Sequence, residues 1–179
     1  MKLLRVCVAF LIGSGLAGEI AAQANVVAAP PRAKLITAAR EIMTAVRYGT
    51  LVTIGVDGQP QARIVDAFAP DSALTVWIGT NAATRKVAEI TRDSRITLMY
   101  FSPSTFEYVT LIGTAVLDSN ATHKAAHWKP DWARLYKDEY RGPDYLLIKV
   151  TPSRIEVVST RRGIANDPVT WRPASVDLP

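Results

Sequence analysis

The sequence is poor in the residues that many hydrolases use for catalysis. Its 179 residues include one cysteine, Cys7, and two histidines, His123 and His127. Cys7 lies in an N-terminal segment that we expect to be removed, which leaves no disulfide, thiolate nucleophile or cysteine metal site. A Ser-His-Asp or Cys-His triad is hard to assemble from what remains. The composition therefore argues against hydrolases of these types.

The two histidines lie in residues 121–136, a segment that predicts a helix broken near Pro130. Their spacing places both rings on one helix face. Lys124 follows His123, however, so the H-E-x-x-H pattern is absent, and no third metal ligand is evident. We expect a solvated helix face beside Trp128 and no metal site.

No apolar run in the chain is long enough to span a bilayer. Residues 1–24 combine Lys2 and Arg5 with an apolar stretch and a small-residue site that ends at Ala24, an order typical of a Sec-type signal peptide. We expect cleavage near Ala24 and an exported protein, periplasmic or secreted, with no stable membrane anchor. A retained N-terminal anchor is the alternative.

The overall composition is that of a globular protein, with 49% hydrophobic and 21% charged residues. The formal net charge of +5 is modest and dispersed, so it does not indicate a nucleic-acid partner. Residues 25–33 contain Pro30 and Pro31 and read as a linker. A single domain over residues 34–179 follows.

Hydrophobic alternation and turn residues predict a mostly β domain with peripheral helices. A hairpin around Pro152 and Ser153 is expected between the last two strands. Because regular βαβ alternation is missing, a mostly antiparallel barrel with helices packed outside fits better than a doubly wound sheet. The expected strands cover residues 50–56, 61–69, 74–80, 95–102, 107–118, 144–151 and 154–159, and the expected helices cover 33–49, 82–92 and 121–136.

The segment "GTNAATRKVAEI" places Arg85 and Lys86 near a helix start, where the helix already carries partial positive charge. We expect Asn81 or Thr80 to cap this helix. A phosphate would bind the free N–H groups and both cations. The alternative is an i, i+4 ion pair between Arg85 and Glu89, with Lys86 in solvent.

A second cation occupies an unusual position in "QARIVDAF". Strand alternation puts Arg63 on the same face as Val65 and Ala67, which favours an anion that meets the guanidinium there. The alternative is an edge-strand arginine that discourages aggregation.

The segments "GQPQARIVDAF" and "LTVWIGTNAATRKVAEITRDSRITLMYF" resemble the FMN-binding split-barrel superfamily of the pyridoxamine 5′-phosphate oxidases, and most closely its general stress protein branch. The resemblance is most specific over residues 49–118 and extends loosely over nearly all of the mature chain. It implies a six-stranded antiparallel split β-barrel that forms a homodimer and binds FMN in a groove between subunits. The cofactor-binding residues that it implies are Arg63, Ile64 and Val65 along the flavin and its phosphate, Thr80 and Asn81 at the phosphoribityl chain, Arg85 and Lys86 as a phosphate clamp, Tyr108 as a polar contact, and Trp171 as a cover.

Two departures from the oxidases argue against vitamin B6 oxidase activity. Phe68 stands where they carry a lysine, and the tail lacks their arginine and histidine pair. The implied function is an FMN-dependent oxidoreductase that acts on a small molecule outside the cytoplasm, with catalytic residues unidentified. The alternatives are a non-catalytic flavin or haem module, with His123 or His127 as axial ligand, and a deazaflavin-dependent reductase with the same phosphate clamp.

Overall fold

The computed structural model describes residues 29–179, so the expected signal peptide and residues 25–28 of the expected linker lie outside the described residues. Pro31 precedes the first helix, which begins at Arg32, inside the segment expected to be linker. The elements along the chain are α1 (Arg32–Val46), β1 (Tyr48–Ile54), β2 (Pro60–Asp66), β3 (Val76–Asn81), α2 (Arg85–Arg92), β4 (Arg95–Phe101), β5 (Tyr108–Asp118), α3 (Ala121–Ala126), η1 (Pro130–Arg134), η2 (Glu139–Arg141), β6 (Tyr145–Val158), η3 (Thr160–Arg162) and β7 (Ala174–Asp177), where η marks a 3-10 helix.

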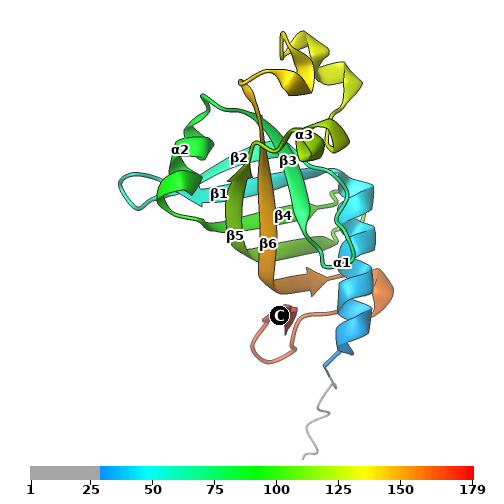
Figure 1. The fold of residues 1–179 in the computed structure, drawn as a ribbon. Helices are drawn as coiled ribbons and strands as arrows, with labels where there is room; N and C mark the ends of the chain where they lie inside the picture. Colours follow the sequence, from blue (N-terminus) through cyan, green and yellow to red (C-terminus); the bar gives the residue numbers. More distant parts are fainter. Residues whose placement is uncertain (1–28) are drawn as a thin grey trace, which may run out of the picture.

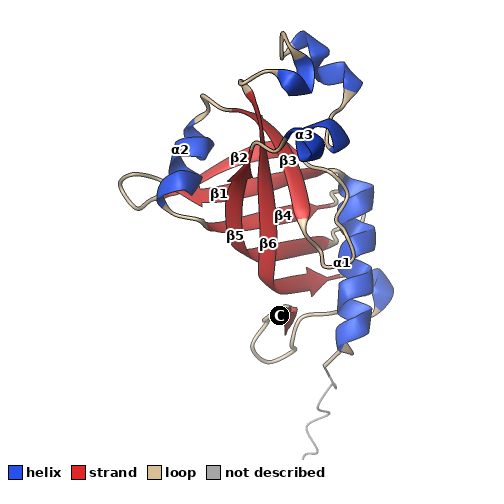
Figure 2. Cartoon of the chain, in the orientation of Figure 1, coloured by secondary structure: helices blue, strands red, loops and turns tan. Residues whose placement is uncertain are grey.

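The strands form one antiparallel sheet in the order β2-β1-β4-β5-β6-β3, and β7 pairs with β6 outside this path. The sheet curls until its two edge strands, β2 and β3, meet at a single bridge between Ala67 and Ile78 (Figure 2). Beside it, the Phe68 N–H donates to the Trp77 carbonyl at 2.9 Å. Elsewhere β2 pairs with β1 and β3 with β6, which leaves a split between them. The expected mostly β split barrel is confirmed.

The core lies inside the curled sheet. Leu51, Leu98 and Leu111 occupy one row across β1, β4 and β5, and all three are fully buried. Along one side of the barrel, α1 packs its apolar face, including Leu35 and Ile42, into the same core (Figure 1). Within residues 29–179, no helix has the length and apolar character needed to cross a membrane.

The C-terminal part differs from the expectation in two ways. The hairpin around Pro152 and Ser153 is wrong, because β6 runs without interruption from Tyr145 to Val158. Pro152 instead lies opposite Gly113, where the pairing between β5 and β6 shifts register. This bulge accommodates the proline, which cannot donate to the ladder. The tail also contributes a strand, β7, that was not expected.

The expected cap of α2 is also wrong. The helix begins at Arg85, and the residue before it, Thr84, makes no side-chain capping bond. Asn81 Oδ1 accepts from the N–H of Ala83 at 2.9 Å, so Asn81 starts a turn ahead of the helix. The predicted break near Pro130 is confirmed, since α3 ends at Ala126 and η1 begins at Pro130.

Candidate functional site

The split between β2 and β3 brings Arg63 and Thr80 to the end of the barrel that α2 covers. Arg63 is half-buried on β2, on the same face as the buried Val65, which confirms the predicted alternation. Its guanidinium extends to Thr53 on β1 and to Glu89 on α2. Arg63, which was predicted to meet an anion, is therefore held at the end of the barrel by β1 and α2.

Glu89 is the centre of this cluster. The residue is only 5% exposed. It accepts from the Thr53 hydroxyl at 2.5 Å and from Arg63 Nη2 at 2.7 Å, and it pairs with Arg85 Nε at 2.9 Å. Burial opposes ionisation of this carboxyl, but the hydrogen bonds and positive charges outweigh it and lower the pKa of Glu89. The carboxylate is therefore ionised at neutral pH.

Lys86 lies beside the same group without a carboxylate of its own. Burial lowers the pKa of Lys86, the charge of Arg63 lowers it further, and Glu89 offsets only part of this. Its ammonium donates to the Thr84 hydroxyl at 3.2 Å, and Thr84 in turn lies 3.1 Å from the hydroxyl of the buried Thr80. Within residues 29–179, Lys86 has no ion pair shorter than 4.0 Å.

The cluster therefore carries more positive than negative charge: Arg63, Arg85 and Lys86 face one carboxylate, Glu89. Of the two sequence alternatives, the structure bears on the ion pair, and the phosphate stays a prediction. The Arg85–Glu89 ion pair is present, but Lys86 is half-buried rather than free in solvent. Two partly desolvated cations beside two hydroxyl groups form an environment that suits a phosphate monoester.

The other residues around the split take different positions. Val65 is buried in the core, and Ile64 points to the outer face of the sheet with 68% of its surface exposed. Asn81 lies at the end of β3, where its side chain holds the turn into α2. Of the nine implied cofactor residues, Arg63 and Lys86 lie beside the buried carboxylate and Arg85 pairs with it from the exposed rim. Thr80 is linked to them through the hydroxyl of Thr84.

Tyr108 and Trp171 do not join this group within one chain. Tyr108 begins β5, three strands along the sheet from Arg63, and points outward because its neighbour Val109 is buried. Trp171 is exposed in the segment before β7, which pairs with the end of β6 next to Tyr108. These two residues belong to a separate part of the surface.

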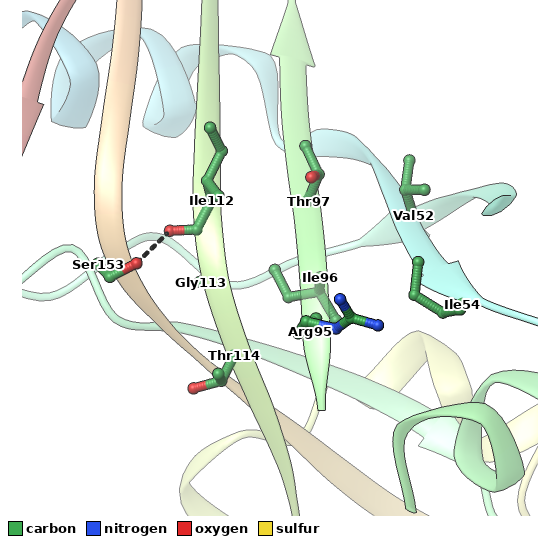
Figure 3. A pocket seen from close by; sticks show the side chains of 9 residues that line it. All are labelled: Val52, Ile54, Arg95, Ile96, Thr97, Ile112, Gly113, Thr114 and Ser153. Atoms are coloured by element: carbon green, nitrogen blue, oxygen red, sulfur yellow. Dashed lines mark hydrogen bonds between the residues drawn. The ribbon is translucent and has the colours of Figure 1, made fainter. Parts of the chain in front are cut away.

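The outer face of the neighbouring strands β2, β1, β4 and β5 exposes several large apolar side chains. Exposed large hydrophobic residues there include Ile64, Met99, Phe101 and Ile112. A shallow hollow of about 380 Å³ opens on this face (Figure 3). Its lining comprises Val52, Ile54, Arg95, Ile96, Thr97, Ile112, Gly113, Thr114 and Ser153. A second hollow, of about 400 Å³, lies between the β1–β2 hairpin and α2 and is bordered by Arg85 and Glu89.

His123 is exposed, as predicted for a solvated helix face, and His127 is half-buried, but both rings pack against Trp77 rather than Trp128. His127 stacks on Trp77 with ring centroids 4.6 Å apart, and His123 lies 5.3 Å from the same indole. Trp128 packs instead in an aromatic cluster with Tyr145 and Trp132. The Trp132 ring covers Gly79 so closely that a Cβ on residue 79 would lie 2.3 Å from the indole. In residues 29–179, no group of three or more histidine, cysteine or acidic residues could hold a metal ion.

Two residues of the cluster, Thr53 and Thr84, and the central role of Glu89 were not predicted from the sequence. Thr53 carried a usable signal, because strand alternation from Leu51 places this polar residue in the core-facing row. Nothing in the sequence showed that α2 packs over the same barrel end.

Comparisons with known proteins agree with the split-barrel fold. The family model described as "Pyridoxamine 5'-phosphate oxidase" matches residues 35–159, which is more than half of the chain. The chain belongs to the pyridoxamine 5′-phosphate oxidase family. No curated protein matches it.

Solved structures share the fold of this family member at low sequence identity. A protein related to general stress protein 26 from Clostridium acetobutylicum has a TM-score of 0.67 and 18% identity, over 80% of this chain and 94% of that one. A pyridoxamine 5′-phosphate oxidase-related, FMN-binding protein from Nostoc punctiforme has a TM-score of 0.58 and 16% identity, over 86% and 98%. A heme-binding protein from Mycobacterium smegmatis has a TM-score of 0.57 and 21% identity, over 73% and 55%.

Proposed function

We propose that the protein binds FMN, with the FMN phosphate held by Arg63 and Lys86 and by the hydroxyl groups of Thr80 and Thr84. The observation that carries the proposal is the excess positive charge around Glu89 at the split between β2 and β3. Family membership supports it, as does the FMN-binding name of the Nostoc punctiforme structure.

When bound, FMN supplies hydride or electron transfer. The residues of the chain bind its phosphate, orient it and limit the access of water to the partly buried cations. We propose that the protein is an oxidoreductase that acts on a small-molecule substrate. No residue at the split is assigned to proton transfer.

The test is the flavin content of the protein purified from its native export route. We expect a flavin absorption band and FMN in the extract by mass spectrometry. Arg85→Ala together with Lys86→Ala should weaken FMN binding far more than it weakens folding. Protein that carries no flavin and has no affinity for added FMN would refute the proposal. Mass spectrometry also separates FMN from a deazaflavin, which would use the same phosphate clamp.

We further propose that two copies assemble through the outer face of β2, β1, β4 and β5. The face exposes Ile64, Met99 and Ile112 beside a shallow hollow, which supports its being covered by an apolar surface such as that of a second copy. A partner would also supply Tyr108 and Trp171, which this chain holds away from its own Arg63. Light scattering should show a dimer, and Ile112→Glu should convert it to a monomer.

We also propose that the protein acts outside the cytoplasm, after removal of residues 1–24. The cationic, apolar and small-residue order of that segment supports export. N-terminal sequencing of the periplasmic or secreted fraction should begin at Asn25. Recovery of the intact chain in the cytoplasm alone would contradict this.

A haem-binding module is the second candidate, favoured by a specific observation. The Nδ1 of His123 lies 2.8 Å from the Asp118 carboxylate, and the Nδ1 of His127 lies 2.9 Å from the His123 carbonyl. Both neutral rings would therefore carry their proton on Nδ1 and leave Nε2 for an axial metal bond. A Soret band on haem titration that is lost in His123→Ala or His127→Ala would favour this function over FMN.

A further inference from the structure

The buried carboxylate in the phosphate site is the feature that the proposed function does not explain. A site for an anion gains nothing from a fixed negative charge inside it, since like charges repel. Glu89 nevertheless lies at the centre, 5% exposed and bonded to Arg63, Arg85 and Thr53. Its role must therefore concern the cations themselves.

Arg63 needs a partner whether or not a ligand is present. Its guanidinium is largely removed from water, with 20% of the side chain exposed, and an unpaired buried cation destabilises the fold. Thr53 accepts from Nη1 and Glu89 accepts from Nη2, and these two hydrogen bonds fix the orientation of the guanidinium plane. Nη1 also donates to the Leu51 carbonyl at 3.4 Å, so within residues 29–179 the N–H on Nε and one N–H on Nη2 are left for a second acceptor.

We propose that Glu89 is an internal counterion that holds Arg63 in its binding orientation and lowers the affinity of the site for anions. The inference rests on the proposed function, because it assumes that the ligand reaches Arg63 and Lys86 through a phosphate. Glu89 then acts as a positioning residue. Its single negative charge offsets one of the two arginines, so the charge of Lys86 and part of the arginine charge remain for the ligand, and the site favours a terminal phosphate monoester over an uncharged flavin.

The chain contains a matched control in Glu107. This residue is also 5% exposed. It accepts from the hydroxyl of Ser159 and from Arg162, with Arg161 at 3.7 Å. Arg162 additionally pairs with Glu41 at 3.1 Å, so two carboxylates face two arginines. Glu107→Gln thus removes a carboxylate of the same burial from a cluster without excess charge.

The experiment compares Glu89→Gln with Glu107→Gln, using FMN, riboflavin and inorganic phosphate as ligands at several salt concentrations. Both variants should lower the stability of the ligand-free protein. Only Glu89→Gln should bind FMN more tightly, by about tenfold, with a steeper salt dependence and no change for riboflavin. Unchanged or weaker FMN binding by folded Glu89→Gln would overturn the inference.

A charge-restored variant keeps the test decisive if Glu89→Gln does not fold. Glu89→Gln together with Arg85→Gln has the net charge of the wild type and should bind FMN within about threefold of it. A much weaker affinity would overturn the counterion role. If the wild type binds neither flavin, the proposed function fails, and the inference is then decided by inorganic phosphate, which should raise the melting temperature of Glu89→Gln more than that of Glu107→Gln.

Discussion

Glu89 and Glu107 form two clusters with nearly the same parts and different charge. Each carboxylate is 5% exposed and accepts from a fully buried hydroxyl residue, Thr53 or Ser159. Each also pairs with one half-buried and one exposed arginine. Around Glu107, a second carboxylate, Glu41, pairs with Arg162 and balances the charge of the two arginines, whereas around Glu89 a third cation, Lys86, is added.

The difference in net charge distinguishes an ion cluster that only joins helices and strands from one that can also bind an anion. The balanced cluster around Glu107 joins α1, the residue before β5 and η3, and it leaves no net charge for a ligand. An unbalanced cluster costs stability in the ligand-free protein, because cations are desolvated without full compensation. Retaining such a cost at the split of the barrel is consistent with an anionic ligand.

The largest effect is expected in the balanced cluster. Arg162→Met removes the guanidinium that joins Glu107 to Glu41 and leaves a buried carboxylate underpaired. The free energy of unfolding should fall by about 3 kcal/mol. Urea unfolding followed by circular dichroism measures it. A loss below about 1 kcal/mol would show that this cluster is not a structural connection.

Lys86→Met should weaken ligand binding without lowering the stability of the ligand-free protein, which is the opposite of Arg162→Met. The variant loses a charge-assisted bond to phosphate of about 1.5–3 kcal/mol, so FMN affinity should fall roughly 10- to 100-fold. The ligand-free protein should be no less stable, since burial already lowers the pKa of Lys86. Fluorescence titration with FMN and urea unfolding check both parts, and exposed Lys137→Met serves as control. If ligand-free Lys86→Met unfolds at a lower urea concentration than the wild type, the cluster around Glu89 does not carry an excess of positive charge that costs stability.

Acid should weaken both clusters. The pKa of Glu89 and of Glu107 lies below the ordinary value of 4.5, because hydrogen bonds and arginines outweigh burial. Below pH 4.5 the unfolded chain binds protons before the folded one, so stability falls until the folded pKa is passed. Each carboxyl contributes about 1.4 kcal/mol for every pH unit between its two pKa values. Glu89→Gln and Glu107→Gln should each flatten this dependence, measured by urea unfolding from pH 6 to pH 3; an unchanged slope would show that other groups dominate.

The smallest effects are expected at the exposed arginines. Arg85 is 66% exposed and Arg161 is 64% exposed, so solvent screens both ion pairs. Arg85→Ala and Arg161→Ala should each lower the free energy of unfolding by about 0.5 kcal/mol or less. Arg85→Ala should weaken FMN binding less than threefold. A larger loss would place Arg85 in direct contact with the phosphate.

Local pattern predicted much of the fold. The strand alternation around Arg63, the break near Pro130 and the antiparallel barrel are confirmed, because side-chain period and proline geometry act over a few residues. The hairpin at Pro152 was wrong because a proline is compatible with a strand when a bulge lies opposite. The cap at Asn81 was wrong because its side chain closes a turn instead.

The sequence by itself determined which residues carry charge and which face of each strand they occupy. It identified Arg63, Arg85 and Lys86, and it included the Arg85–Glu89 pair as an alternative. Only the tertiary structure decided that Glu89 reaches across to Arg63 and Thr53, 26 and 36 residues away in the chain. Such contacts depend on how α2 packs over the open end of the barrel, and they are set by the packing of the whole sheet rather than by any local pattern.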